Sequence, residues 1–280
     1  MTAASASRRS PPEALAAFYE RPPEVVLADE AWPEAHAALL DHLEAGTVRA
    51  AERRADGSWV PVPWVKAAIL VGFQRSGTVE LPGPGSPSFD KTAYPPRTFT
   101  LQDAVRLVPG GSAVRRGAHL GRGVVVMPPA YVNVGAFVGD GTMVDSHALV
   151  GSCAQIGARV HLSAAAQVGG VLEPVGALPV IVEDEAFVGG MVGLFEGIVV
   201  RRRAVLAAGV ILTASTTIYD LVHGREWRRE VPESAVVVPG TRAAQGRFAQ
   251  ERGLQIAAPL IVKYRDARTD GATALEEALR

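Results

Sequence analysis

Between residues 114 and 212 almost every sixth residue is a branched aliphatic, and this regularity restricts the chain to very few folds. The ladder runs without interruption from Val114 to Val168 and resumes out of phase at Val182. A period of six matches neither the 3.6-residue turn of an α-helix nor the two-residue alternation of an ordinary strand. The aliphatic positions are Val114, Leu120, Val126, Val132, Val138, Val144, Val150, Ile156, Leu162, Val168, Val182, Val188, Leu194, Val200, Leu206 and Leu212.

The six-residue period is typical of a hexapeptide β-helix, in which each unit forms one flat face and one corner of a triangular coil. Three units, about 18 residues, complete one turn, and the stacked turns bury a continuous aliphatic core. Glycine often follows the aliphatic, as at Gly139 and Gly151, and we expect it to supply the turn geometry of the corner. The predicted fold is mainly β: a left-handed parallel β-helix with an N-terminal α/β domain and a C-terminal extension.

The break in the ladder predicts a loop at about 170–181. Val168 and Val182 are 14 residues apart, and the stretch between them contains Pro174, Gly176 and Pro179. Such a segment cannot continue the coil and should leave it as a loop. Loops that project from rigid scaffolds often carry function.

The rest of the chain divides around the coil. We predict an N-terminal domain at 1–110, the β-helix at 111–220 and a C-terminal extension at 221–280. Helices are expected at 13–19 and 34–43, the second with Pro33 in its first turn and Gly46 as its stop. The other expected elements are strands within 47–73 with a turn at Asp56-Gly57 and including 64–71, a linker or active-site loop at 81–89, strands at 236–238 and 260–262, and a final helix at 272–280.

Composition argues against several classes of function. The net charge is −1 and the longest basic run is Arg201–Arg203, expected to be a solvated edge, so nucleic acid is not an expected partner. No apolar run is long enough to span a membrane and no signal peptide is evident, so we expect a cytoplasmic protein with no membrane partner. The single cysteine, Cys153, is expected to be a small buried thiol.

Several short segments carry a specific family resemblance. Residues 143–157 resemble the tetrahydrodipicolinate N-succinyltransferases, enzymes of diaminopimelate and lysine biosynthesis. The shorter runs 89–91, 160–163, 169–174 and 261–263 resemble the same family. The resemblance implies a homotrimer in which succinyl-CoA lies along a groove between neighbouring subunits. It also implies a small-molecule amine acceptor and no metal.

The resemblance assigns roles to individual residues in the acceptor site. Arg106 stands three residues before a Pro-Gly pair, where the family has an Arg that binds a carboxylate, and its planar fork suits that role. Asp145 follows Gly-Thr-Met-Val, where the family has an Asp that contacts the substrate amine and could accept its proton. Asp145 also stands where most units have Gly, so it should be exposed at a corner. Glu196 matches a second carboxylate of the family and is the other catalytic candidate.

Coenzyme binding is predicted from residue type. Grooves of this kind hold CoA through the backbone amides of small residues, and Gly170, Ala208 and Gly209 are candidates. Lys263, in the matching tail, could meet a phosphate. The co-substrate is therefore expected to be succinyl-CoA or another acyl-CoA.

The chain departs from the family at one motif. Where the family commonly reads Gly-Ala-Arg-Ser-Glu-Val-Val-Glu-Gly, residues 189–197 read Gly-Gly-Met-Val-Gly-Leu-Phe-Glu-Gly. Gly193 replaces a catalytic Glu, Met191 and Val192 replace Arg and Ser, and His147 replaces a Trp. Two interpretations remain open. The protein is either an N-acyltransferase with another acceptor or acyl donor, including acetyl-CoA, or the lysine-pathway enzyme with Glu196, His147 or water in the lost role.

Other classes are less consistent with the sequence. A non-catalytic trimeric scaffold would also tolerate the lost Glu. A γ-type carbonic anhydrase shares this coil but needs three metal-binding His, for which only His119, His147 and His161 are available. A sugar-nucleotide transferase would carry a Gly-rich phosphate-binding N-terminal domain, which this sequence lacks.

Overall fold

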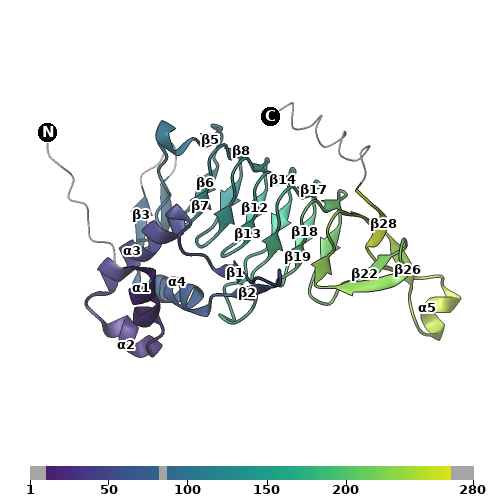
Figure 1. Ribbon diagram of the computed structural model, residues 1–280, viewed down its shortest axis with the longest axis horizontal. Helices are drawn as coiled ribbons and strands as arrows, with labels where there is room; N and C mark the ends of the chain where they lie inside the picture. Colours follow the sequence, from purple (N-terminus) through teal and green to yellow (C-terminus); the bar gives the residue numbers. More distant parts are fainter. Residues whose placement is uncertain (1–10, 82–86, 266–280) are drawn as a thin grey trace.

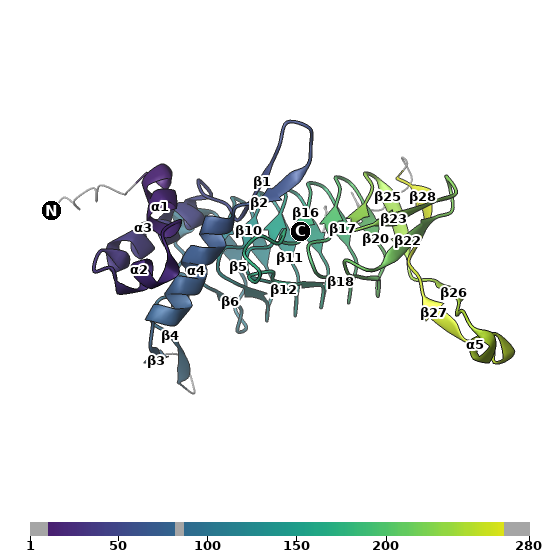
Figure 2. The same ribbon diagram turned by 90° about the horizontal axis from the view of Figure 1, so that it is seen from below.

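The computed structural model describes residues 11–81 and 87–265 and shows an elongated molecule (Figure 1). Helices gather at the N-terminal end, a long coil of short strands forms the middle, and a small arm lies at the C-terminal end (Figure 1). In the view from below, the hairpin β1–β2 lies beside the coil and the arm points away from its far end (Figure 2). The coil therefore separates two smaller parts.

The coil consists mostly of two-residue strands, and the second residue of each is the ladder aliphatic. Successive strands belong in turn to three parallel sheets, which we call faces A, B and C. Each strand pairs with the strands of the same face one turn below and above, as β12 does with β9 and β15. The corners are named A–B, B–C and C–A after the faces that they join.

The strands of each face follow in order along the coil axis. Face A contains β6 (Ala113–Val114), β9 (Tyr131–Val132), β12 (Leu149–Val150), β15 (Gln167–Val168), β18 (Gly193–Leu194) and β21 (Ile211–Leu212). Face B contains β7 (His119–Leu120), β10 (Phe137–Val138), β13 (Gln155–Ile156), β16 (Ile181–Val182), β19 (Val199–Val200) and β24 (Glu230–Val231). Face C contains β5 (Arg106–Leu107), β8 (Val125–Val126), β11 (Met143–Val144), β14 (His161–Leu162), β17 (Phe187–Val188), β20 (Val205–Leu206) and β25 (Ala235–Val238).

The ladder residues fill the inside of the coil, as predicted. Val138, Val150 and Leu194 are fully buried, and the alanines two positions before the aliphatics line the same core. Removing a Val, Leu or Ile side chain from water stabilises the folded chain by about 1.5–3 kcal/mol. A continuous core of such residues therefore holds the turns together, and the predicted β-helix is confirmed.

The corners owe their shape to a different residue from the one predicted. The third residue before most of the aliphatics adopts a left-handed backbone, with φ of +74° at Gly135 and +63° at His147; the prolines before Val132 and Val182 are exceptions. Gly139, which follows its aliphatic, lies outside that region. A Cβ on Gly139 would lie 2.6 Å from the carbonyl carbon of Gly157 in the next turn. The prediction that these glycines supply turn geometry is wrong, because they are needed where stacked turns approach closely.

The break in the ladder is a loop, as predicted. Between Val168 and Val182 the chain passes only from face A to face B, so a spacing of 14 residues replaces the usual six. The loop packs against the N-terminal part of the molecule: Leu172 contacts its core, and Lys66 Nζ donates a hydrogen bond to the Ala177 carbonyl.

The coil extends beyond the limits of 111 and 220 that the ladder suggests. Strand β5 joins face C through its pairing with β8. After a hairpin of β22 (Thr217–Asp220) and β23 (Arg225–Arg228), strands β24 and β25 continue faces B and C. Val231 and Val237 take the inward positions and are fully buried. Because the inserted hairpin interrupts the six-residue spacing after Leu212, the sequence does not show that Val231 and Val237 continue the ladder.

The N-terminal part combines helices with two hairpins. Its elements are α1 (Pro12–Tyr19), α2 (Pro23–Ala28), α3 (Trp32–Ala45), β1 (Ala51–Arg53), β2 (Trp59–Pro61), α4 (Pro63–Arg75), β3 (Thr78–Leu81), β4 (Ser88–Lys91) and the 3₁₀ helix η1 (Leu101–Asp103). Gly46 ends α3 in a left-handed conformation, as predicted. The helices form a second core, which Val134 and Cys153 of the coil join. The predicted burial of the Cys153 thiol is thereby confirmed.

Helix α4 contradicts the strand predicted at 64–71. Pro63 occupies the first turn, where its missing N–H costs no hydrogen bond. Val65, Ala68 and Ile69 are fully buried against the helical core. A short run of mostly apolar residues fits either a buried strand or a buried helix, and here packing against α1 and α2 selects the helix.

The C-terminal part confirms both predicted strands. Residues 236–238 lie in β25, and 260–262 lie in β28 (Leu260–Tyr264), which pairs with β25 in antiparallel fashion. The arm contains β26 (Thr241–Ala243), α5 (Arg247–Glu251) and β27 (Gln255–Ala257). The helix predicted at 272–280 and the centre of the loop predicted at 81–89 lie outside the described residues. Within residues 11–81 and 87–265, no helix is long and apolar enough to cross a membrane.

Candidate functional site

The two predicted catalytic carboxylates lie on opposite edges of face A. Asp145 follows β11 at the C–A corner, and Glu196 follows β18 at the A–B corner. Along the axis, the strands β12, β15 and β18 are neighbours, so Glu196 lies two turns further along the coil than Asp145. A single chain therefore does not bring these two residues together.

Asp145 is placed by the coil and keeps one oxygen available. Its backbone N–H donates to the Leu162 carbonyl at 2.9 Å, which fixes the corner to the next turn. Its Oδ1 accepts a hydrogen bond from the Ser146 amide at 2.6 Å. Among the residues that the structure describes, none donates to Oδ2. The half-buried carboxylate can therefore receive a donor from outside the chain.

Arg106 lies on the same side of the coil as Asp145. It begins β5 on face C, where the strand order runs from Arg106 through Val125 to Met143. Parallel strands lie about 4.8 Å apart, so Arg106 is roughly 10 Å from Met143, which lies just before Asp145. The Arg106 side chain is exposed. Arg106 and Asp145 could therefore hold two ends of one small molecule.

The Gly193 position has no room for a carboxylate. Gly193 is buried, and a Cβ on it would lie 2.6 Å from Cε2 of Phe195 and 2.9 Å from Cδ1 of Ile211. The Phe195 ring also covers Gly169, whose Cβ would meet Cδ1 at 2.7 Å. An aromatic ring thus occupies the space beside the two glycines. Sequence analysis missed this role of Phe195, although the family motif has a smaller Val at that position.

Glu196 and the predicted CoA-binding residues are all exposed. The Glu196 carboxylate accepts a hydrogen bond from the Ala214 amide at 3.1 Å. Ala208 and Gly209 lie at the C–A corner, three turns beyond Asp145, whereas Gly170 begins the loop at the A–B corner. Lys263 lies on β28, beside face C.

The amides of these small residues differ in their availability. The Gly209 amide donates to the Gly190 carbonyl at 2.9 Å and is already used within the coil. The amides of Gly170 and Ala208 donate to no acceptor in the described part of the chain. Ala208 and Gly170 are therefore better placed than Gly209 to bind a ligand through the backbone.

The three histidines of the metal alternative are dispersed. His119 lies on face B, His161 on face C and His147 at the C–A corner. His119 stacks on Phe137 and its Nδ1 is 2.8 Å from the Glu44 carbonyl. Within residues 11–81 and 87–265, no group of three or more His, Cys, Asp or Glu side chains could hold a metal ion.

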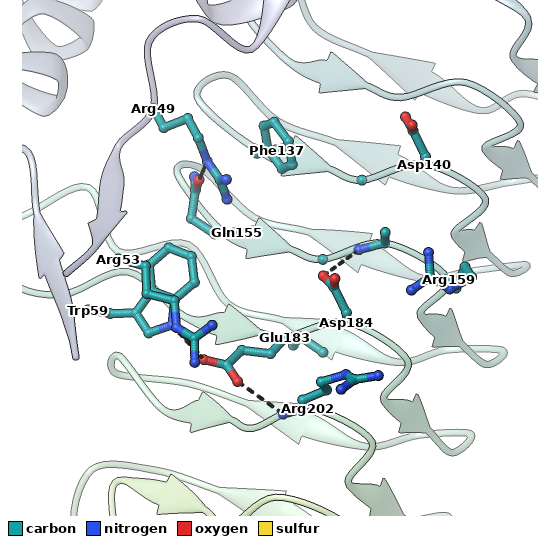
Figure 3. A pocket seen from close by; sticks show the side chains of 14 residues that line it. Arg49, Arg53, Trp59, Phe137, Asp140, Gln155, Arg159, Glu183, Asp184 and Arg202 are labelled. Carbon is teal, nitrogen blue, oxygen red and sulfur yellow. Dashed lines mark hydrogen bonds and ion pairs between the residues drawn. The ribbon is translucent and has the colours of Figure 1, made fainter. Parts of the chain in front are cut away.

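A well-defined pocket lies elsewhere, at the B–C corner under the β1–β2 hairpin (Figure 3). Its volume is about 520 Å³, and none of the predicted site residues lines it. Its lining residues are Arg49, Arg53, Trp59, Phe137, Gly139, Asp140, Gln155, Gly157, Ala158, Arg159, Val182, Glu183, Asp184 and Arg202.

The basic run at 201–203 borders this pocket. Arg201 bridges Glu183 at 3.0 Å and Glu230 at 2.8 Å, and Arg202 pairs with Glu185 at 2.9 Å. The run is thus part of an ion-pair network, and its interpretation as a solvated edge fits exposed Arg202 but not partly buried Arg201.

The coil points to a class of protein. A triangular prism of hexapeptide units is a scaffold that many acyltransferases share. The fold therefore places the chain in the hexapeptide-repeat class.

Comparison with known sequences identifies the family. Residues 16–74 match the family described as the N-terminal domain of tetrahydrodipicolinate N-succinyltransferase, and residues 179–214 match the hexapeptide repeat of succinyl-transferase. The chain is 46% identical over 250 residues to the 2,3,4,5-tetrahydropyridine-2,6-dicarboxylate N-succinyltransferase of Rhodopseudomonas palustris, covering 86% of this chain and 87% of that protein. The enzyme of the same name from Azoarcus sp. is 45% identical over 253 residues, covering 88% and 89%. The chain belongs to the tetrahydrodipicolinate N-succinyltransferase family, and the predicted resemblance is confirmed.

Proposed function

We propose that the protein is a CoA-dependent N-acyltransferase. It transfers a succinyl or related acyl group from acyl-CoA to the amine of an amino-acid-like or tetrahydrodipicolinate-like acceptor, without a metal, in the cytoplasm. The observation that carries this proposal is the Asp145 carboxylate, which stands in the family's motif with Oδ2 open to a donor from outside the chain. Family membership over most of the chain supports the same class of reaction.

The proposed chemistry assigns one step to each group. Arg106 pairs with a carboxylate of the acceptor and so orients its amine toward Asp145. Asp145 Oδ2 takes a proton from the amine as its nitrogen attacks the thioester carbonyl carbon. The C–S bond then breaks, and the CoA thiolate takes up the proton, leaving an amide and free CoA. Backbone amides stabilise the oxyanion between these steps.

A trimer would complete this site. Because Asp145 and Glu196 lie on opposite edges of face A, the C–A corner of one copy must face the A–B corner of another for both to touch one substrate. Cyclic association of three copies supplies that arrangement. In this assembly, Ala208 contributes its amide from one corner and Gly170 from the other, with Lys263 and Gly209 further along the CoA groove.

Phe195 favours a changed substrate over the unmodified lysine-pathway reaction. It fills the space beside Gly193 with an aromatic ring, where the family motif has a carboxylate. Exposed Met191 and half-exposed Ile211 extend this apolar surface. A site lined in this way favours an acceptor or acyl chain with fewer charged groups, so acetyl-CoA is a realistic donor. In the alternative, Glu196 or His147 takes the role of the catalytic Glu that Gly193 replaces. This alternative predicts that succinyl-CoA remains the preferred donor.

Thiol release from purified protein tests the proposal. Succinyl-CoA and acetyl-CoA are compared, each with tetrahydrodipicolinate, 2-aminopimelate and a monocarboxylic amino acid as acceptor. We expect turnover that requires both an acyl-CoA and an amine. If no pair of substrates reacts and CoA also fails to raise the melting temperature, the protein is a scaffold and the proposal is overturned.

A further inference from the structure

The pocket at the B–C corner is a separate place for a ligand. It lies between the β1–β2 hairpin and the coil, whereas Asp145 lies at the C–A corner across face C. Its walls come from segments far apart in the sequence, since Arg49 and Trp59 face Gln155 and Asp184 (Figure 3). The acyl transfer proposed above uses none of these residues.

Arg49 is held in place by contacts that leave its terminal nitrogens unused. Its Nε donates to Gln155 Oε1 at 2.8 Å. The Gln155 amide is fixed in turn, because its Nε2 donates to the Cys153 carbonyl at 2.9 Å. The guanidinium lies 3.8 Å from the centre of the Phe137 ring. Neither terminal nitrogen has a hydrogen-bond acceptor among residues 11–81 and 87–265, although the group is oriented for a planar, bidentate partner.

The other arginines of the pocket are paired with glutamates. Arg53 is 3.6 Å from Glu183. Arg159 and Arg202 both pair with Glu185, at 2.8 and 2.9 Å. Arg49 is therefore the one pocket cation, of those described, without a carboxylate partner at ion-pair distance. Burial lowers the pKa of Arg49 to about 10, although the Asp184 and Glu52 carboxylates act in the opposite direction from beyond ion-pair distance.

Two carboxylates on the coil side of the pocket each accept a hydrogen bond through only one of their two oxygens. Asp140 Oδ1 accepts the Arg122 amide at 2.9 Å, and Asp184 Oδ1 accepts the Ala158 amide at 2.9 Å. The second oxygen of each accepts no hydrogen bond from the described residues. Figure 3 shows Arg49 on the hairpin side and both aspartates on the corner of the coil. The pocket thus presents one unpaired cation on one wall and unpaired anionic oxygens on another.

We propose that this pocket binds a small zwitterion of the ω-amino-acid class, with its carboxylate on Arg49 and its ammonium group on Asp184 and Asp140. The arrangement favours a zwitterion over a simple anion, which would bind Arg49 but leave the second oxygens of Asp140 and Asp184 without a hydrogen-bond donor. It selects equally against a simple amine, which would leave Arg49 unpaired. Between the two charged ends, the Trp59 and Phe137 rings offer an apolar wall for a short methylene chain. The site is distinct from the acceptor site and does not depend on the proposed acyl transfer.

A binding experiment with matched probes tests this inference. Binding of 6-aminohexanoate, hexanoate and hexylamine to the full chain is measured by calorimetry without any CoA present, and followed by tryptophan fluorescence. We expect saturable binding of 6-aminohexanoate in the millimolar range, about tenfold tighter than either singly charged probe. Replacing Trp59 by Phe should remove the fluorescence change but not the heat of binding.

Variants assign the binding to this pocket. Arg49→Gln should abolish binding, whereas Arg54→Gln, an exposed Arg on the same hairpin, should leave it unchanged. Asp184→Asn keeps the acceptor for the Ala158 amide and should lose only the preference for the amine-bearing probe. Arg106→Gln, in the proposed acceptor site, should have no effect. The inference is overturned if 6-aminohexanoate fails to bind or binds no better than hexanoate, if folded Arg49→Gln binds normally, or if binding is lost in Arg106→Gln.

Discussion

The B–C and C–A corners occupy equivalent places in the hexapeptide repeat but carry opposite chemistry. At the B–C corner, the second residue after each face B aliphatic is in turn Arg122, Asp140, Ala158, Asp184 and Arg202, and the four charged ones take part in hydrogen bonds and ion pairs. At the C–A corner, the residue that directly follows each face C aliphatic is in turn Met127, Asp145, Ser163, Gly189 and Ala207, so the one carboxylate stands among uncharged side chains. One corner carries charged side chains of both signs in most of its turns, and the other carries a single charge.

The difference shows where a β-helix can vary. The ladder aliphatics face the core, where any polar replacement would be buried. The residue three positions before most aliphatics must accept a left-handed backbone, as His147 does. The other corner side chains, such as that of Asp145, have neither constraint and can be changed without altering the coil. Function in this fold is therefore encoded at the corners, and substitutions there should separate activity from stability.

The largest effect should come from two aspartates at different corners. Asp145→Asn should lower kcat by about 10²–10⁴-fold, because the amide cannot accept the proton of the attacking amine. Asp140→Asn, at the B–C corner, should leave acyl transfer close to that of the unmodified protein. Steady-state kinetics with the best acyl-CoA and amine would measure both. Equal losses in the two variants would contradict the functional distinction between the corners.

The next effect concerns the aromatic ring beside Gly193. Gly193→Glu should destabilise the fold by about 3 kcal/mol or more, because its side chain meets Phe195 and buries an unpaired charge. Adding Phe195→Val should recover part of that loss by restoring space. Urea unfolding of the single and double variants measures the coupling. If the two changes are simply additive, Phe195 does not fill the place of the lost carboxylate.

Asp220, at the far end of the coil, is a buried carboxylate that is fully paired, in contrast to Asp145. Asp220 is 2% exposed. Burial raises its pKa, but hydrogen bonds to its carboxylate outweigh this and hold the pKa well below the usual range. The donors are the backbone of Val222 and His223 and the side chains of His223, Arg225, Trp227 and Tyr264.

Because the folded-state pKa of Asp220 is depressed, its stabilisation is present above the unfolded-state pKa, about 4, and is lost as the pH falls below it. Asp220→Asn should cost about 2–3 kcal/mol at neutral pH and flatten the acid side of the stability profile. Glu226→Gln, on the same hairpin but exposed, serves as the control. Urea unfolding between pH 3 and 7 would show the difference. An unchanged acid slope in the Asp220 variant would rule out this linkage.

The smallest effect should come from the exposed ion pairs of the B–C corner. Glu185→Gln removes the partner of Arg159 and Arg202 and should cost less than about 1 kcal/mol, because such pairs are well solvated. The loss should shrink further at high salt. Thermal unfolding at two salt concentrations measures it. A loss of several kcal/mol would mean that this corner is structural, and the comparison between corners would need revision.

Some of these features could be predicted from the sequence and others could not. The ladder predicts the coil because inward aliphatics must recur every six residues to fill a triangular core. Helix α4 could not be predicted, since an apolar stretch of that length suits either a strand or a helix until its neighbours are known. For the site, the placement of Asp145 at a corner was predictable from its position next to Val144, although the structure leaves it half-buried. The filling of the Gly193 space by Phe195 was not.

What the sequence by itself determined is the periodic part of the protein: the β-helix, the position of its loop, and the corner that presents Asp145. Periodicity is sufficient there because each unit packs only on its neighbours, so local spacing sets the fold. The tertiary structure decided the spatial relations between residues that are far apart in the sequence. It separates Asp145 from Glu196 across face A, and it brings Arg49 against Gln155 to form the pocket under the hairpin. No spacing rule spans 106 residues, so only the packed molecule sets that contact.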